Sequence, residues 1–364
     1  MRIVFCWYYY EQYLKSFYAA NPWFSGMSYQ EQTKLLQSDF YGEPGSYATW
    51  AERLGHDCEL IITNCEPMQR RWAEEHNIPF GDDWQKTVAL EQVKQFQPDV
   101  FYMCSLFAFY GDFLAEVKKY SRKVVGWIAC PIPKNVNLNQ MDAILSSSPQ
   151  FVDNFRKQGI VSERLLPAFD PDILKYIDDI SSELEIPFSF VGGVTRFHKE
   201  RYKILTQLVE KSPLEVWGYG VKPQSILEMV RNLLSGRHFV DPIVRRYKGE
   251  VWGLGMYRTL KRSNISFNSH IDIAGDWCGN MRMFEATGIG SLLLTDNKKN
   301  NSELFEPDKE VVVYNSIDDA IEKVSYYLSH DEERKNIAVA GQQRTLANYG
   351  MKDKVIKMID IFGR

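Results

Sequence analysis

The feature that most constrains the fold is a regular alternation of short apolar runs with helical patterns along the chain. Such runs are typical of parallel strands joined by crossover helices, because both faces of a parallel sheet are covered. The strands expected in the first half are Arg2–Trp7, Cys58–Thr63, Val100–Cys104, Val124–Ile128, Ala143–Ser146 and Arg164–Pro167. Those expected in the second half are Pro187–Val191, Leu214–Trp217, Ile265–Asn268, Ser291–Thr295 and Glu310–Tyr314.

An acidic, proline-containing segment from Phe169 to Pro187 separates the two series and suits a linker. We therefore predict an α/β protein with two doubly wound, Rossmann-like domains that face each other across a cleft. Residues 1–180 form the first domain and residues 187–346 the second. An insertion at residues 9–42, rich in Tyr, Phe and Trp, forms either an aromatic surface for a sugar-like ligand or a packed subdomain.

Composition excludes several classes of protein. A length of 364 residues suits two domains, and 45% hydrophobic with 25% charged residues is ordinary for a globular chain. The formal net charge of −4 argues against a nucleic-acid partner. The six cysteines show no zinc-like spacing, and no apolar run approaches the roughly 20 residues of a membrane span. We expect a cytoplasmic protein without a transmembrane segment. The sequence is compatible with peripheral contact with a membrane.

The first candidate ligand site follows strand Pro187–Val191, where two glycines precede a cluster of basic residues. Ligands of doubly wound sheets bind beyond the carboxyl ends of the strands, and cations at a helix N-terminus are unfavourable there without an anion. A bound diphosphate would make the cations favourable at this position. The simpler alternative is a solvated helix start with ordinary surface charge. The candidate residues are Gly192, Gly193, Arg196, His198 and Lys199.

A second candidate lies on the helix expected after Asn280, where Arg282 and Glu285 share a face at i,i+3 spacing. At the ligand end of the sheet, a carboxylate can accept the hydroxyls of a ribose and an arginine can hold phosphate. The alternative is an internal ion pair between Arg282 and Glu285.

The segment NMRMFEATGIGSLLLTD from Asn280 resembles the signature of GT-B nucleotide-sugar-dependent glycosyltransferases of the spore-maturation type. Further similar segments extend this resemblance over about Pro187 to Leu346. The resemblance implies that Glu285 binds the donor ribose, that Asn280 and Arg282 lie near the donor, and that the Gly192–Gly193 loop lies near its phosphates. Trp277 stands where many retaining members have a first glutamate, so the resemblance supplies no retaining mechanism.

The same resemblance implies an acceptor side in the first domain and a terminal helix, residues 347–364, that crosses back to it. Gly45 and Ser46 match the first glycine-containing turn of acceptor domains, although a tight turn with an N-cap explains them equally well. The aromatic candidates on this side are Trp7, which ends the first strand, and Tyr8, which follows it.

Three residues are candidates for the base that takes the acceptor's proton: His270 and Asp272 in the loop before Asn280, and Asp112 in the first domain. We predict a metal-independent glycosyltransferase without a cofactor, which moves a sugar from a nucleotide diphosphate sugar to a hydroxyl of a glycan, a protein or a small molecule. A non-catalytic binder of sugar nucleotides or glycans, or an epimerase of the same fold, are the alternatives.

Overall fold

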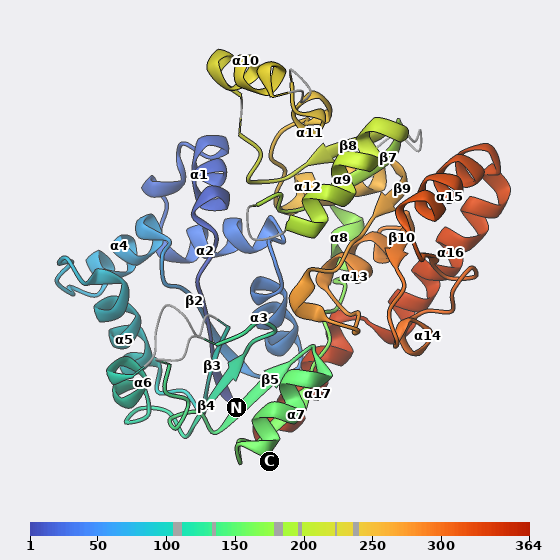
Figure 1. The fold of residues 1–364 in the computed structure, drawn as a ribbon. Helices are drawn as coiled ribbons and strands as arrows, with labels where there is room; N and C mark the ends of the chain where they lie inside the picture. Colours follow the sequence, from blue (N-terminus) through green and yellow to red (C-terminus); the bar gives the residue numbers. More distant parts are fainter. Residues whose placement is uncertain (105–110, 133–135, 178–184, 196–198, 223, 236–239) are drawn as a thin grey trace. The chain divides into compact units, whose positions relative to one another are not determined.

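The computed structural model describes residues 1–104, 111–132, 136–177, 185–195, 199–222, 224–235 and 240–364 (Figure 1). The chain forms two compact units. Unit 1 comprises Met1–Asp170 together with Met351–Arg364, and unit 2 comprises Pro171–Gly350. Among the described residues, none of the helices combines the length and the apolar character that a membrane crossing requires.

Unit 1 is built on a six-stranded sheet in the order β2-β1-β3-β4-β5-β6, in which every neighbouring pair is parallel. Most of its strands are apolar and largely buried, as expected for a parallel sheet covered by helices on both faces. The strands are β1 (Arg2–Trp7), β2 (Asp57–Ile62), β3 (Val100–Met103), β4 (Lys123–Trp127), β5 (Ala143–Ser146) and β6 (Ser162–Arg164). The helices are α1 (Glu11–Ala20), η1 (Phe24–Gly26), α2 (Tyr29–Ser38), α3 (Pro44–Arg53), α4 (Glu66–Glu75), α5 (Trp84–Phe96), α6 (Asp112–Val117), α7 (Pro149–Lys157) and α17 (Met351–Gly363).

The aromatic insertion at residues 9–42 folds into α1, η1 and α2. A capping box between Ser28 and Glu31 starts α2. The rings of Tyr13 and Tyr41 stack with centroids 3.6 Å apart, and Tyr9, Tyr13 and Phe24 are buried. Most of these aromatic faces therefore contact one another, as a packed subdomain requires.

The C-terminal helix α17 belongs to unit 1 and packs against α3. Lys354 of α17 places its ammonium nitrogen 2.8 and 2.7 Å from the two carboxylate oxygens of Glu43, and both side chains are buried. The Tyr47 hydroxyl and the Ala168 backbone N–H also donate to Glu43. This buried ion pair joins residues that are 311 positions apart in the sequence.

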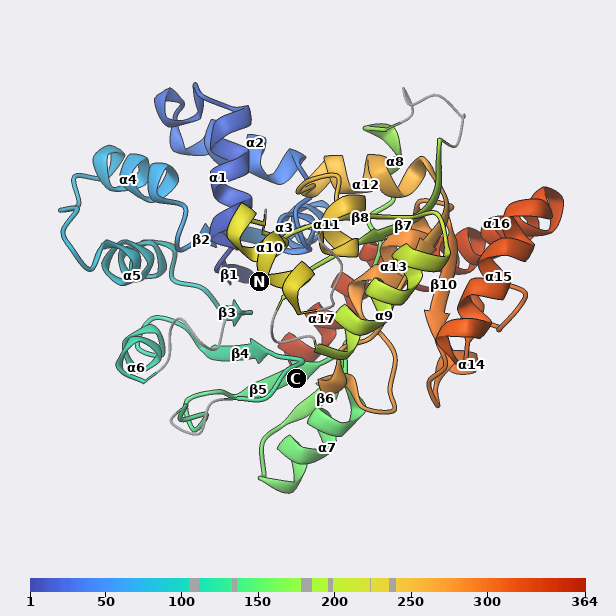
Figure 2. The same ribbon diagram turned by 45° about the horizontal axis from the view of Figure 1, so that its top comes forward.

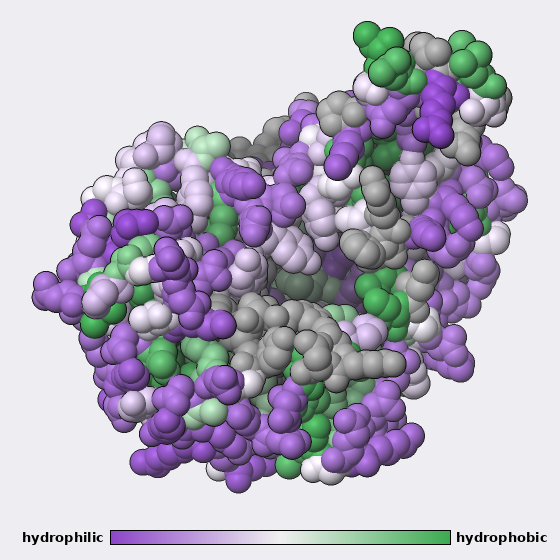
Figure 3. Space-filling model, turned by 60° about the vertical axis from the view of Figure 1, so that its left-hand side comes forward, coloured by the Kyte–Doolittle hydropathy of each residue, from purple (hydrophilic) through white to green (hydrophobic). Residues whose placement is uncertain are grey.

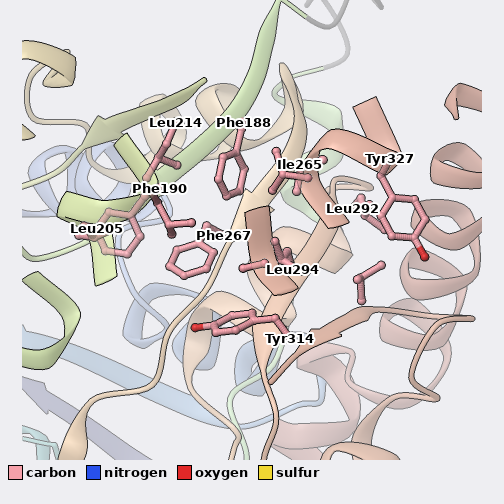
Figure 4. Close-up of a cluster of buried hydrophobic side chains, with 14 of the residues drawn as sticks. Phe188, Phe190, Leu205, Leu214, Ile265, Phe267, Leu292, Leu294, Tyr314 and Tyr327 are labelled. Carbon is pink, nitrogen blue, oxygen red and sulfur yellow. The ribbon is translucent and has the colours of Figure 1, made fainter. Parts of the chain in front are cut away.

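Unit 2 is built on a five-stranded parallel sheet in the order β11-β10-β9-β7-β8. Phenylalanine, leucine and isoleucine side chains of these strands form its core with Leu205 and Tyr327 from the covering helices (Figure 4). The strands are β7 (Ile186–Val191), β8 (Leu214–Trp217), β9 (Ser263–Phe267), β10 (Leu292–Asp296) and β11 (Val312–Tyr314).

The helices of unit 2 follow its strands in the βα pattern, except α8, which precedes β7. They are α8 (Asp172–Lys175), α9 (Lys199–Lys211), α10 (Ile226–Leu234), α11 (Pro242–Arg246), α12 (Gly253–Lys261), η2 (Asp272–Ala274), α13 (Met281–Gly288), α14 (Asn301–Leu304), α15 (Ile317–Ser329) and α16 (Asp331–Asn348). Helices α15 and α16 lie side by side (Figures 1 and 2), and α16 packs against β10 and α13. The predicted fold class, with two parallel-sheet α/β domains, is confirmed.

The chain passes from unit 1 to unit 2 between Asp170 and Pro171, earlier than the boundary expected from the sequence. Asp170 accepts a hydrogen bond from the Trp50 indole within unit 1. Shortly after it, the Tyr176 carbonyl accepts a hydrogen bond from Arg258 within unit 2. Asp170 and Tyr176 thus belong to different units.

Candidate functional site

The candidate site lies in unit 2, at the carboxyl ends of β7 and β9. From β7 the chain moves to β8 on one side, and it then crosses to β9 on the other side of β7. The loops after β7 and β9 therefore diverge, and a crevice at such a switch point is the usual ligand position in an open parallel sheet.

The loop after β7 lies alongside the loop after β8, and the two are joined by backbone hydrogen bonds. The Gly192 N–H donates to the Trp217 carbonyl, and the Val194 N–H donates to the Tyr219 carbonyl at 2.9 Å. Gly218 has φ of +121°, and a Cβ there would lie 2.1 Å from the Gly192 oxygen. Glycine is thus required at position 218 for the close approach of the two loops.

Arg201 of α9 connects the loops on both sides of the switch point. Its guanidinium donates to the Ser269 carbonyl after β9 at 2.7 Å and to the Gly193 carbonyl after β7 at 3.3 Å. Among the described residues, the buried atoms without a hydrogen-bond partner include Arg201 Nε and the Thr195 hydroxyl. Burial lowers the pKa of Arg201, and the like charge of Arg282 acts in the same direction.

Arg282 and Glu285, which share one face of α13, form the internal ion pair that was the alternative interpretation of the sequence. The distance between their charged atoms is 2.8 Å, and their side chains are 14% and 8% exposed. Arg282 Nε also donates to the carbonyl of Val191, the last residue of β7. The pair therefore lies at the end of β7, and its carboxylate is turned toward an arginine rather than held free for a ribose.

Asn280 precedes α13 but does not cap it with its side chain. Its amide instead exchanges hydrogen bonds with the amide of Asn268, at 2.8 and 3.2 Å. The first turn of α13 carries no acidic residue. The partial positive charge of this helix N-terminus is thus not offset by a carboxylate from its own first turn, which favours an anion nearby.

His270, one of the three candidate bases, has hydrogen bonds at both ring nitrogens. Nδ1 lies 2.7 Å from Asp296 Oδ1, and the Gly279 N–H donates to Nε2 at 3.2 Å. Because Nε2 accepts, the ring hydrogen lies on Nδ1 and is donated to Asp296. Although burial opposes it, bonding to His270 lowers the pKa of Asp296. This arrangement places His270 as a positioning residue for the loop that leads to α13.

The remaining predicted residues of unit 2 are only partly described. Lys199 is the exposed first residue of α9. Arg196, His198 and the side chain of Asp272 lie outside the described part of the structure.

In unit 1, the predicted acceptor-side residues follow β1 or begin α3. The half-buried Trp7 packs its ring near Tyr47 and Tyr102. Burial, followed by the charge of Glu11, raises the pKa of the half-buried Tyr8. Gly45 and Ser46 are buried in the first turn of α3, and Gly45 lies beside Gln37. The N-cap of α3 is Glu43, so Ser46 is not the N-cap that the alternative interpretation expected.

Asp112, the third candidate base, is the exposed first residue of α6 in unit 1. A carboxylate in the first turn of a helix is stabilised by the helix dipole, so this position has an ordinary structural explanation as well.

Three further residues border the site and were not among the predicted site residues: Arg201, Tyr219 and Trp252. Tyr219 and Trp252 stack with ring centroids 5.5 Å apart, and a side chain at Gly193 would collide with Tyr219. The basic cluster that begins α9 was a usable signal for Arg201. The sequence contains no such signal for the aromatic pair, because Tyr219 and Trp252 are 33 positions apart.

Comparison with protein families found a match in the second half of the chain. Residues 201–360, less than half of the chain, match the model of a family described as glycosyl transferase-like. No curated protein sequence matches the chain.

Solved structures resemble the chain over its whole length. A glycosyltransferase from Rickettsia africae is 12% identical with a TM-score of 0.56, covering 99% of this chain and 97% of that one. Sucrose-phosphate synthase from Thermosynechococcus elongatus is 8% identical with a TM-score of 0.57, covering 100% and 98%. The Anabaena protein HepE in complex with UDP-glucose is 11% identical with a TM-score of 0.56, covering 99% of each chain. At these identities the likeness shows the fold, which is that of GT-B glycosyltransferase structures.

Proposed function

We propose that this protein transfers a sugar from a nucleotide diphosphate sugar to an acceptor hydroxyl. The observation that carries the proposal is the convergence of Arg201 and Arg282 at the switch point of unit 2. Each guanidinium holds a carbonyl of the loop at the end of β7, and each carries the same charge. Glu285 pairs with Arg282 in this structure, and a diphosphate would add an anion that both guanidiniums can bind.

The donor's diphosphate is proposed to lie beside Gly192 and Gly193, with Arg201, Arg282 and the N-terminus of α13 as its donors. Lys199 adds charge from the start of α9. The stacked Tyr219–Trp252 pair offers an apolar wall for the nucleobase. The structural likeness to HepE in complex with UDP-glucose supports a uridine nucleotide as the first donor to test.

Glu285 is proposed to bind the ribose hydroxyls after it exchanges its bond to Arg282 for them. A phosphate oxygen then replaces the carboxylate at Arg282, so neither charge loses its partner. The resemblance of the Asn280–Asp296 segment to the spore-maturation-type group supports this assignment.

The proposed reaction joins the acceptor oxygen to the anomeric carbon and breaks the bond from that carbon to the diphosphate oxygen. The acceptor proton passes to a base, for which Asp112 and Asp272 stay candidates and His270 is less suited because both ring nitrogens are bonded. Charge that develops on the diphosphate is stabilised by the two arginines and the helix amides, so the proposal requires no metal or cofactor. The acceptor is proposed to contact Trp7 and Tyr8 of unit 1, and the protein to act in the cytoplasm.

A non-catalytic sugar-nucleotide binder is the second candidate. It is favoured by Trp277, which replaces the first glutamate of many retaining enzymes, and by the ion pair that occupies Glu285.

Thermal-shift and nucleotide-release assays with UDP, GDP, dTDP and CDP sugars test the proposal and separate the two candidates. A donor at about 100 times its Kd adds roughly 2.7 kcal/mol to the stability. Release of nucleotide that requires an acceptor supports transfer, and binding without release supports the binder. Absence of a shift with every donor would refute both.

Variants then test the site. Arg201→Gln should weaken donor binding about tenfold or more, since a charge-assisted hydrogen bond contributes about 1.5–3 kcal/mol. Lys203→Gln, which removes an exposed cation from the same helix, should leave donor binding unchanged. Glu285→Ala should abolish the shift, and an unchanged shift in a folded Glu285→Ala protein would remove this residue from the site.

A further inference from the structure

Helix α10 of unit 2 exposes an apolar face that the proposed sugar transfer does not use. Four of its large apolar side chains are strongly exposed: Ile226 is 76%, Leu227 82%, Leu233 61% and Leu234 83% exposed. Ile226 and Leu233 are seven positions apart, as are Leu227 and Leu234, so all four lie on one side of the helix. Figure 1 shows α10 apart from the sheet of its unit, and apolar side chains (green) gather at the upper right of Figure 3.

The sequence specifies this helix locally, although its apolar face is not buried. Ser225 and Glu228 form a capping box, in which the Ser225 N–H donates to the Glu228 carboxylate at 2.8 Å and the Glu228 N–H donates back to the Ser225 hydroxyl. Gln224, just before the helix, accepts a hydrogen bond from the Asp241 N–H and so ties the base of α10 to the start of α11. The exposed leucines therefore belong to a formed helix.

The segment around α10 is basic in a chain that is acidic overall. Residues 221–248 contain two acidic side chains, Glu228 and Asp241, and both are engaged in starting helices. The basic side chains of the same segment are Lys222, Arg231, Arg237, Arg245, Arg246 and Lys248. The segment thus carries a formal net charge of +4, against −4 for the whole chain.

We propose that α10 docks this protein on an anionic membrane surface, with its leucine face in the acyl boundary and described basic residues such as Arg231 and Arg245 among the lipid headgroups. An amphipathic helix with an aliphatic face and basic flanks lies in the plane of a membrane interface. The aliphatic side chains favour acyl chains over nucleic-acid bases, which stack on aromatic rings. A symmetric contact between two copies would bring two positively charged segments together. This inference does not depend on the proposed sugar transfer.

Co-sedimentation of the full chain with lipid vesicles tests the proposal. Binding is expected to vesicles that contain phosphatidylserine and to be much weaker with phosphatidylcholine alone. Raising the salt from about 0.1 M to about 1 M shortens the screening length from about 10 Å to about 3 Å and should release the protein. Each basic residue removed, as in Arg231→Gln or Arg245→Gln, should weaken binding about fivefold.

The double variant Leu227→Ser/Leu234→Ser should weaken binding about tenfold or more, since two large apolar side chains no longer enter the membrane. Its melting temperature should stay near that of the parent, because both side chains are already exposed. The matched control is Val339→Ser/Leu346→Ser, which removes two exposed aliphatic side chains, also seven positions apart, from α16 of the same unit.

Three outcomes would overturn the proposal. These are no sedimentation with any vesicle, an equal loss of binding in the α16 control, and a dimer in sedimentation velocity that the α10 variant abolishes. The last outcome would assign the leucine face to a second copy of the chain.

Discussion

Removing the ammonium group of Lys354 should destabilise unit 1 strongly, because the Glu43 carboxylate would stay buried without its counter-charge. The Lys354 and Glu43 side chains are 4% and 8% exposed, and their charged atoms are 2.7 Å apart. Breaking a buried pair by removing one partner costs about 3–5 kcal/mol. The Tyr47 hydroxyl and the Ala168 N–H still donate to Glu43 in the variant, so a value near 3 kcal/mol is expected for Lys354→Met. For a unit of this size that loss lowers Tm by roughly 6–12 °C.

Urea unfolding followed by circular dichroism measures this loss. Lys357→Met is the matched control, since Lys357 lies on the same helix but is exposed, and it should change the free energy of unfolding by less than about 0.5 kcal/mol. Glu43→Gln in the Lys354→Met background should restore part of the stability, with a coupling energy of about 1 kcal/mol or more. A loss below about 1 kcal/mol for Lys354→Met, or strict additivity of the two substitutions, would refute the reasoning.

Two further predictions concern unit 2. Hydrogen bonding lowers the pKa of Asp296 below its ordinary value of 3.8, so its contribution to stability is present above about pH 4 and is lost as the pH falls below that value. The difference in unfolding free energy between the parent and Asp296→Asn should therefore shrink below about pH 4. A difference that stays constant down to pH 3 would contradict this prediction. Gly218→Ala should cost about 2 kcal/mol or more, because a Cβ would collide with the Gly192 oxygen, whereas Gly255→Ala, in a helix with open space around it, should stabilise by about 0.5–1 kcal/mol. Equal denaturation midpoints for these two glycine variants would be incompatible with the described loop contact.

Most strands were predictable because they are continuous apolar runs, and their ends are shifted by a few residues from those expected. The exception is β6, the polar segment Ser162–Arg164, which shares only Arg164 with the expected strand Arg164–Pro167. The helices of the aromatic insertion were not predicted, since the abundance of Tyr and Phe in α1 concealed its helical spacing. The long helix α16 was also not singled out, as its apolar residues do not gather on one clear face.

The candidate site was predictable only as a position. The order of strands and glycines indicated the loop after β7, but the spacing of Arg282 and Glu285 alone favoured an internal ion pair slightly over a ligand site. The hydrogen bonds of His270 depend on how the chain turns between Asn268 and Asn280, which brings the Gly279 N–H to the ring. Such contacts depend on the path of the backbone, which residue types and spacing along the sequence do not reveal.

Unit 2 is one continuous stretch of chain, whereas unit 1 is completed by the last fourteen residues, Met351–Arg364. During synthesis, unit 1 therefore lacks α17, and Glu43 lacks Lys354, until the ribosome has finished the whole of unit 2. Synthesis of unit 1 starts before that of unit 2 but is completed after it. A recombinant fragment that ends near residue 170 would leave that carboxylate buried without its cation, while a fragment of residues 171–350 contains every part of its own sheet.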